Sequence, residues 1–175
     1  GDWDKDGRSE IYKKAELSKE DYSKIFKICK KNKISFLTSL FNPEDYELIS
    51  HLRINTIKIP SPENRNNNLI RFCNSKYKNI LLSTGAASIN EIKKSFKLFQ
   101  RKKNIVLLHC VSRYPCEDKY INLPRINELK KISSSIGISD HSPDILSSVF
   151  SLNQGVKYIE KHFTIDNDLP GRDNA

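Results

Sequence analysis

The 175-residue sequence contains no methionine and only one tryptophan. The missing methionine, with glycine at position 1, predicts a piece of a longer product rather than a complete translated chain. No apolar run approaches the ~20 residues that a membrane-spanning helix requires. Residues 1–17 have no apolar core of the kind found in signal peptides. We therefore expect no membrane partner.

Cysteine is scarce, and the four cysteines are Cys29, Cys73, Cys110 and Cys116. They form neither a Cys-x-x-Cys pair nor a disulfide-scaffold spacing, which favours a reducing compartment and predicts a cytoplasmic protein. The sequence also lacks a Gly-x-Gly-x-x-Gly motif and a P-loop. Nothing in it therefore supports a dinucleotide site or a Walker-type nucleotide site.

Positive charge exceeds negative charge, because 30 lysines and arginines face 21 aspartates and glutamates, for a formal net charge of +9. Such an excess is compatible with an anionic partner, either a nucleic acid or a phosphorylated small molecule. The lysines are spread over the expected helices, which is typical of solvated helix faces. We therefore expect no nucleic-acid partner from charge alone.

A strand followed by a helix recurs along the chain. Apolar runs predict six strands, at residues 34–40, 56–59, 80–82, 105–108, 136–139 and 158–159. Helices are expected at 18–33, from 43, at 69–73, from 88, at 126–132 and from 143. A repeat of roughly 25 residues predicts a parallel sheet and suits a (β/α)₈ barrel of ~250 residues. Six units are two short of closure, so the predicted fold is α/β, an incomplete TIM barrel.

A doubly wound open sheet is the structural alternative, and periodicity does not exclude it. Polar residues stand where each expected strand gives way to a loop: Ser39, Ser61, Ser83, His109, Ser139 and His162. A barrel gathers such residues around one rim, whereas an open sheet concentrates its site at one switch point. This distribution favours the barrel.

Two histidines follow neighbouring strands, in Ser139-Asp140-His141-Ser142 and in Glu160-Lys161-His162-Phe163. Neutral imidazole nitrogens bind divalent first-row metal ions, and adjacent strand ends bring side chains to a common point. His141 and His162 could therefore hold one metal ion. The alternative is that both are structural hydrogen-bonding residues, since two ligands do not define a site. His109 has a weaker claim, and His51 is expected to face solvent.

Lys58 lies within the apolar run Ile57-Lys58-Ile59-Pro60. A strand lysine between isoleucines is costly to bury without an anion, so a phosphate or carboxylate ligand is plausible, although Glu63 could simply pair with it. Ser83-Thr84-Gly85 offers hydroxyls and a small residue before a helix N-terminus, which suits an anion but is also common as plain capping. Asp173 would by itself be an ordinary loop acid.

Taken together, these motifs resemble the sialic acid synthase family in order and spacing. The matching segments, from about Tyr12 to Ala175, are Lys58-Ile59-Pro60-Ser61-Pro62-Glu63, Leu81-Leu82-Ser83-Thr84-Gly85, Leu107-Leu108-His109-Cys110 with Tyr114-Pro115, Gly137-Ile138-Ser139-Asp140-His141-Ser142, and Ile159-Glu160-Lys161-His162-Phe163 with Leu169-Pro170-Gly171-Arg172-Asp173. The resemblance is to enzymes of the N-acetylneuraminate and legionaminic acid synthase type. It implies a barrel followed by an antifreeze-like domain, in a homodimer.

The resemblance also implies an activity and its residues. Family members condense phosphoenolpyruvate with an N-acetylmannosamine-type sugar and water, giving a nonulosonic acid and phosphate for cell-surface polysaccharides. His141 and His162 would hold Mn²⁺ or Mg²⁺. Phosphoenolpyruvate would contact Lys58, Ser61, Ser83 and Ser139, and the sugar would lie along the catalytic residues Glu63, Tyr114 and Asp173.

The sequence differs from the family pattern at several positions. Ser39-Leu40-Phe41 replaces Thr-Pro-Phe, Ser112 replaces an asparagine, and Pro170-Gly171-Arg172-Asp173-Asn174 replaces Pro-Gly-Pro-Asp-His. By resemblance, residues 1–175 form one partial catalytic domain with barrel strands 3–8. It lacks the first two strands, the closing helix and the antifreeze-like domain. We expect this piece alone to be inactive and poorly stable, because an open barrel leaves strand edges unpaired.

Two alternative functions stay open. The chain could be a non-catalytic basic barrel fragment or binding module whose histidines are structural. It could also be a different phosphoenolpyruvate-dependent barrel synthase, which the acceptor sugar would distinguish. Neither the acceptor, the native metal nor the assembly follows from the sequence.

Overall fold

The computed structural model describes residues 10, 13–100 and 103–169. The chain divides into two compact units, which are Gly1–Phe36 with Glu44–Ile54, and Leu37–Pro43 with Asn55–Ala175. Among the described residues, no helix is both long and apolar enough to cross a membrane.

The first unit is helical. Helix α2 (Lys19–Lys31) begins where the sequence predicts a helix, and Ser18 and Asp21 bond reciprocally there in a capping box. Its Phe26 ring packs edge-on against Phe36 with centroids 5.8 Å apart. Helix α3 (Tyr46–Ile49) and the 3₁₀ turn η2 (Ser50–Leu52) follow. His51 is exposed as expected, but it also forms a 2.6 Å hydrogen bond with Ser23 Oγ.

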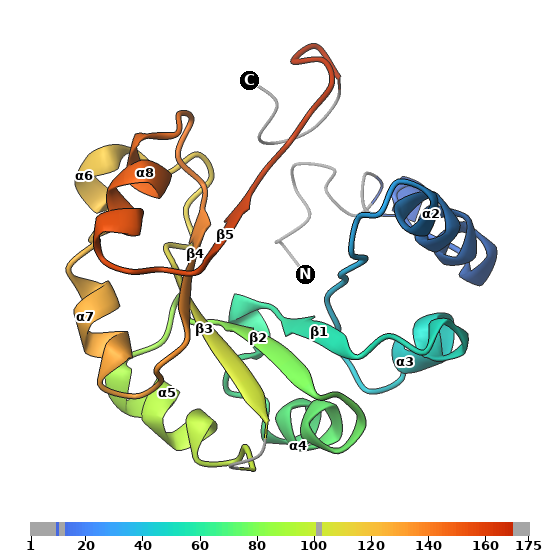
Figure 1. Ribbon diagram of the computed structural model, residues 1–175, viewed down its shortest axis with the longest axis horizontal. Helices are drawn as coiled ribbons and strands as arrows, with labels where there is room; N and C mark the ends of the chain where they lie inside the picture. Colours follow the sequence, from blue (N-terminus) through green and yellow to red (C-terminus); the bar gives the residue numbers. More distant parts are fainter. Residues whose placement is uncertain (1–9, 11–12, 101–102, 170–175) are drawn as a thin grey trace. The chain divides into compact units, whose positions relative to one another are not determined.

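The second unit is built on a five-stranded parallel sheet (Figure 1). The strands are β1 (Thr56–Ile59), β2 (Asn79–Ser83), β3 (Asn104–Cys110), β4 (Ile136–Asp140) and β5 (Tyr158–Lys161). Their spatial order β1-β2-β3-β4-β5 is the order in sequence, and each neighbouring pair is parallel. A doubly wound sheet reverses its strand order, which these strands do not do. The curled sheet is therefore an incomplete barrel.

The predicted first strand, residues 34–40, is wrong for most of its length. Only Ser39 forms a bridge, parallel to Lys58 of β1. Two backbone hydrogen bonds support it, from Lys58 N–H to the Thr38 carbonyl and from Leu40 N–H to the Lys58 carbonyl, each 3.0 Å long. Leu40 is buried, but Ile34 and Leu37 are 63% and 41% exposed, so the apolar residues of this run do not share one buried face that would hold it as a strand.

Helices pack against one face of the sheet, which we call the outer face (Figure 1). They are α4 (Asn67–Lys76), α5 (Ile89–Phe96), α7 (Arg125–Lys130) and α8 (Leu146–Asn153), and the short α6 (Asp118–Ile121) and η3 (Ser61–Glu63) lie in loops. Fully buried side chains from strands and helices meet there, including Ile57, Ile80, Leu82, Leu107, Leu69, Ile92, Ile126 and Leu129. Each such burial stabilises the fold by about 1.5–3 kcal/mol.

Two helices begin later than the sequence predicted. The helix expected from residue 43 starts at Tyr46, and the helix expected from residue 143 starts at Leu146. In both places a proline-containing turn precedes the helix instead of forming its first turn. Helix α8 is also unusual, because its buried residues are Ser147, Ser148 and Ser151. Its small polar face lies inward, where the serines can bond to the end of β4.

The other face of the sheet, the inner face, carries the residues that alternate with this core. Leu81, Val106 and Leu108 form an apolar cluster there. The register pairs Lys58 with Leu81 and Leu108 with Gly137, so these strands present the same face. The inner face is thus apolar in its middle and leads to Lys58 and the histidine-bearing segments at the carboxyl ends of the strands.

Candidate active site

Strand alternation brings the predicted site residues to the inner face at the carboxyl ends of the strands. Register pairs Cys110 of β3 with Ser139 of β4, and Ser139 with Glu160 of β5. His141 and His162 each follow two residues later, so they are on the same side as Ser139 and Glu160. Parallel strands that end together therefore present a row of polar groups along one rim.

The two predicted metal ligands meet. The ring centroids of His141 and His162 are 5.3 Å apart and the rings are nearly perpendicular. Tyr114 covers both rings, with centroid distances of 4.1 Å to His141 and 5.9 Å to His162. Both histidines also line a pocket of about 220 Å³. The structure thus joins three predicted site residues from different segments into one cluster.

The surroundings of His141 suit a metal ligand. Its Nδ1 is 3.0 Å from the Val111 carbonyl, and Nδ1–H donating there leaves the lone pair on Nε2, which lies near Ser139 Oγ at 3.5 Å. Burial lowers the pKa of His141, which favours the neutral imidazole. A carbonyl that fixes the tautomer in this way is the usual partner of a metal-binding histidine. The chemistry of the pair therefore fits a divalent ion.

The histidine pair does not by itself complete a metal centre. Within residues 10, 13–100 and 103–169, no group of three or more His, Cys, Asp or Glu side chains is arranged to hold a metal ion. Catalytic metal ions in proteins commonly keep open coordination positions for water or substrate. An ion at His141 and His162 would accordingly have coordination positions left for a reacting molecule.

Lys58 has an anionic partner that the sequence analysis did not identify. Its Nζ lies 2.6 Å from Oε1 of Glu160, and Ser139 Oγ donates to the same oxygen at 2.6 Å. Burial alone would raise the pKa of Glu160, but the contacts with Lys58 and Ser139 lower it, so the carboxylate is ionised. Glu160 stands in the strand two residues before His162, and that spacing was the signal that could have identified it.

The interpretation that Lys58 pairs with Glu63 is wrong. Glu63 instead accepts a 2.8 Å hydrogen bond from Asn66 at the start of α4, and the described residues include no Lys58–Glu63 ion pair. Because η3 turns the chain just after β1, the Glu63 carboxylate is directed to the helix cap rather than back to the strand. Glu63 remains at the carboxyl end of β1, beside the rim.

Hydroxyl groups gather around Gly85. Its N–H donates to Ser61 Oγ at 3.1 Å. A Cβ added at Gly85 would lie 2.5 Å from Ser112 Oγ and 2.7 Å from Ser61 Oγ, so glycine lets the loop approach these side chains without moving them. Ser83, two residues before Gly85, has a buried hydroxyl with no hydrogen-bond partner among the described residues. Buried polar groups are rarely left unpaired, so Ser83 is suited to receive a ligand.

The remaining predicted residues separate into three cases. Ser39 lies beside Lys58 through its bridge. His109 is buried on the outer face, where its Nε2 contacts the Ile121 carbonyl at 2.7 Å, and burial lowers its pKa. It is therefore a structural histidine and not part of the rim. Asp173 lies outside the described residues.

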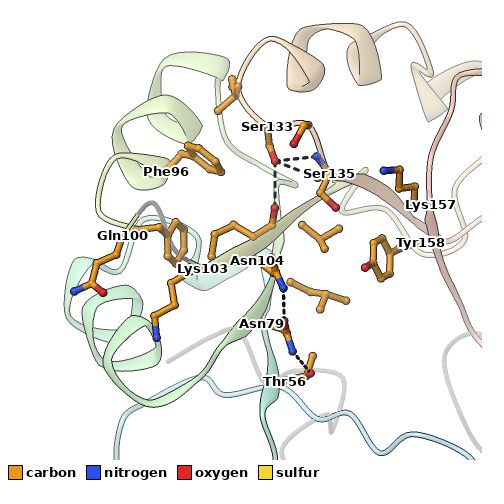
Figure 2. Close-up of a pocket in the computed structure, with 16 residues that line it drawn as sticks. Thr56, Asn79, Phe96, Gln100, Lys103, Asn104, Ser133, Ser135, Lys157 and Tyr158 are labelled. Atoms are coloured by element: carbon orange, nitrogen blue, oxygen red, sulfur yellow. Dashed lines mark hydrogen bonds between the residues drawn. The ribbon is translucent and has the colours of Figure 1, made fainter.

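The larger groove of this unit lies at the opposite ends of the strands (Figure 2). It has a volume of about 770 Å³ and is lined by uncharged polar groups, two phenylalanines, and Lys103 and Lys157. A side-chain ladder runs along it, from Asn104 to Asn79 at 2.9 Å and from Asn79 to Thr56 at 3.2 Å. It contains none of the histidines or carboxylates that catalysis would use, so we place the candidate site at the carboxyl end.

Two curated synthases are similar to this chain in sequence. The chain is 34% identical over 177 residues to the pseudaminic acid synthase of Campylobacter jejuni, covering 99% of this chain and 52% of that protein. It is 32% identical over 170 residues to the N,N'-diacetyllegionaminic acid synthase of the same organism, covering 94% of this chain and 51% of that protein. The chain thus spans about half the length of these curated relatives.

A solved structure has the same architecture. The N-acetylneuraminic acid synthetase of Leptospira borgpetersenii superposes with a TM-score of 0.91 at 30% identity, over 98% of this chain and 61% of that chain. The model of the NeuB family also matches this sequence, over residues 1–175. On these matches, and on the fold that agrees with them, the chain belongs to the NeuB family.

Proposed function

We propose that this chain forms part of a synthase that condenses phosphoenolpyruvate with an N-acetylmannosamine-type sugar and water, giving a nonulosonic acid and phosphate. The relatives that carry the names of sialic, pseudaminic and legionaminic acid synthases support a nonulosonic acid product. The single observation that carries the proposal is the rim cluster, in which the His141–His162 pair lies beside Lys58, Ser139 and Glu160.

The proposed donor is a dianion or trianion, and the rim offers groups that suit it. Lys58 would supply the positive charge, and Ser61, Ser83 and Ser139 would donate hydrogen bonds to its carboxylate and phosphate oxygens. Ser112 adds a hydroxyl beside Gly85, and Ser39 lies next to Lys58. Because Glu160 already neutralises Lys58, a donor oxygen must displace or join that carboxylate. Contacts of this kind fix the donor carbon for attack.

The sugar would occupy the side of the rim nearer the histidines. Tyr114 offers an exposed aromatic side chain there, while Glu63 and Asp173 are the proposed carboxylates along the sugar. A Mn²⁺ or Mg²⁺ ion held by His141 and His162 would supply Lewis-acid polarisation of the sugar aldehyde. In the reaction, the methylene carbon of phosphoenolpyruvate bonds to the aldehyde carbon, water adds at the donor's C2, and phosphate leaves. The homodimer expected from the resemblance stays a prediction.

A product assay tests this proposal. The protein expressed from its complete gene would be incubated with phosphoenolpyruvate, Mn²⁺ and either N-acetylmannosamine or a diacetamido analogue, and the products weighed by mass spectrometry. We expect a nine-carbon 2-keto acid and one equivalent of phosphate with at least one of these sugars. If these sugars give no product but another acceptor sugar does, the protein is a different phosphoenolpyruvate-dependent barrel synthase. No turnover and no donor binding would support a non-catalytic binding module.

A further inference from the structure

A second pair of residues lies directly behind the two histidines. Asp140 and Lys161 immediately precede His141 and His162, and they are register partners across β4 and β5. Because side chains alternate along a strand, this pair lies on the outer face while the histidines lie on the inner face. Lys161 Nζ is 3.1 Å from Asp140 Oδ2, so an ion pair joins the two strand ends that carry the histidines.

The pair is buried and its carboxylate is held at several points. The Asp140 side chain is 1% exposed and that of Lys161 is 24% exposed. Asp140 Oδ2 also accepts a 2.5 Å hydrogen bond from Ser148, on the inward serine face of α8. Surface ion pairs contribute little to geometry or stability, but a buried carboxylate with fixed donors has one favoured position.

Both members of the pair also hold the residue that follows His141. Asp140 Oδ1 accepts the Ser142 N–H at 2.9 Å, which closes a turn around His141. Lys161 Nζ donates to the Ser142 carbonyl at 2.7 Å. On the other side, the His141 carbonyl accepts the Cys116 N–H at 2.8 Å. Lys161, which precedes one histidine, is therefore bonded to Asp140 and Ser142, the residues on either side of the other histidine.

We propose that Asp140 and Lys161 are positioning residues that set the spacing and orientation of His141 and His162 for one divalent ion. This inference rests on the proposed metal site. Asp140 and Lys161 border the same pocket as the histidines, but strand alternation directs them to the opposite face, so their link to His141 runs through the backbone of Ser142. Residues that orient metal ligands in other proteins change metal affinity by about 10–100-fold when they are replaced.

Mn²⁺ affinity tests the proposal, measured by electron paramagnetic resonance of free Mn²⁺ with the protein expressed from its complete gene. Lys161→Met and Asp140→Asn should each weaken binding by about 10-fold. Lys157→Met is the matched control, because it removes the same charge four residues earlier, beside the groove at the opposite end of the sheet (Figure 2). The control should bind Mn²⁺ as tightly as the unchanged protein.

A second measurement, made on folded protein, distinguishes the proposed positioning role from a purely structural one. Nuclear Overhauser contacts between the Tyr114 and His141 rings, whose centroids are 4.1 Å apart, report the ring arrangement without metal. We expect these contacts to weaken in Lys161→Met and to persist in Lys157→Met at temperatures well below unfolding. Unchanged ring contacts together with unchanged Mn²⁺ affinity in both pair variants would overturn the inference.

The proposed function and this inference fail in different ways. If the unchanged protein binds no Mn²⁺, or if His141→Ala binds it normally, the metal site itself is wrong. The ring contacts then still decide whether Asp140 and Lys161 position the histidines. If Mn²⁺ binding depends on His141 but not on Lys161 or Asp140, only the inference is wrong.

Discussion

The two ends of the same five strands differ in the chemical groups that they carry. At the amino end, a groove of about 770 Å³ is crossed by the Asn104–Asn79–Thr56 ladder, whose amides bond to one another. At the carboxyl end, two imidazoles line a smaller pocket, and the Lys58–Glu160 ion pair and the unpaired buried Ser83 hydroxyl lie at the same ends of the strands. Cavity volume alone would favour the amino end. The imidazole pair and the carboxylate with a perturbed pKa favour the carboxyl end as the candidate site.

Loss of the histidine pair should have the largest effect. We expect His141→Ala with His162→Ala to lower Mn²⁺ affinity by at least about 100-fold, because the described residues offer no third ligand to compensate. Calorimetric titration with Mn²⁺ measures this affinity. His51→Ala is the control, since that residue belongs to the other unit of the chain. Tight binding in the double variant would place the ion elsewhere.

Removal of the rim lysine should come next. Lys58→Met deletes a charge-assisted hydrogen bond worth about 1.5–3 kcal/mol, which corresponds to about 10–100-fold weaker phosphoenolpyruvate binding. Lys103→Met removes a lysine from the amino-end groove, where its Nζ donates to the Tyr77 carbonyl, and should leave donor affinity unchanged. Fluorescence or calorimetric titration with phosphoenolpyruvate distinguishes them. Equal losses in both variants would remove the contrast between the two ends.

The amino-end ladder should affect stability without affecting ligand binding. Asn104→Ala removes the 2.9 Å bond to Asn79 and should lower the free energy of unfolding by about 1 kcal/mol. Urea denaturation followed by circular dichroism measures this change. Mn²⁺ and phosphoenolpyruvate affinities should stay as in the unchanged protein. A loss of either affinity would show that the two ends are coupled.

The smallest expected effect concerns pH. Hydrogen bonds from the Ser88 backbone, Arg65 and the Ser88 hydroxyl lower the pKa of Glu91 from 4.5 to about 2. A carboxyl whose pKa is lower in the folded state stabilises the fold above its unfolded pKa and loses that contribution as pH falls. Glu91 is exposed, so the change should be slight. Glu91→Gln should flatten the decline in stability between pH 4.5 and 2, followed by urea denaturation at each pH. If the free energy of unfolding falls equally steeply with pH in Glu91→Gln, the Glu91 carboxylate does not stabilise the helix cap.

Much of the fold followed from local pattern. Apolar runs identified the positions of β1 to β5, and the helices expected at 18–33 and from 88 correspond to α2 and α5, which begin with the capping pairs Ser18–Asp21 and Ser88–Glu91. These signals are local because a strand or a cap depends on residues within a few positions. The failed strand at 34–40 shows the limit. An apolar run becomes a strand only where the fold buries one of its faces.

The sequence by itself determined that His141 and His162 stand just beyond two strands, with Lys58 inside a third and serines at the turns. Only the tertiary structure decided which groups meet: Glu160 with Lys58, 102 positions apart, His109 on the outer face, and Asp140 with Lys161 behind the histidines. The reason is physical. Side-chain alternation is a local property of each strand, whereas partners across a sheet depend on register between strands, which packing of the whole unit sets.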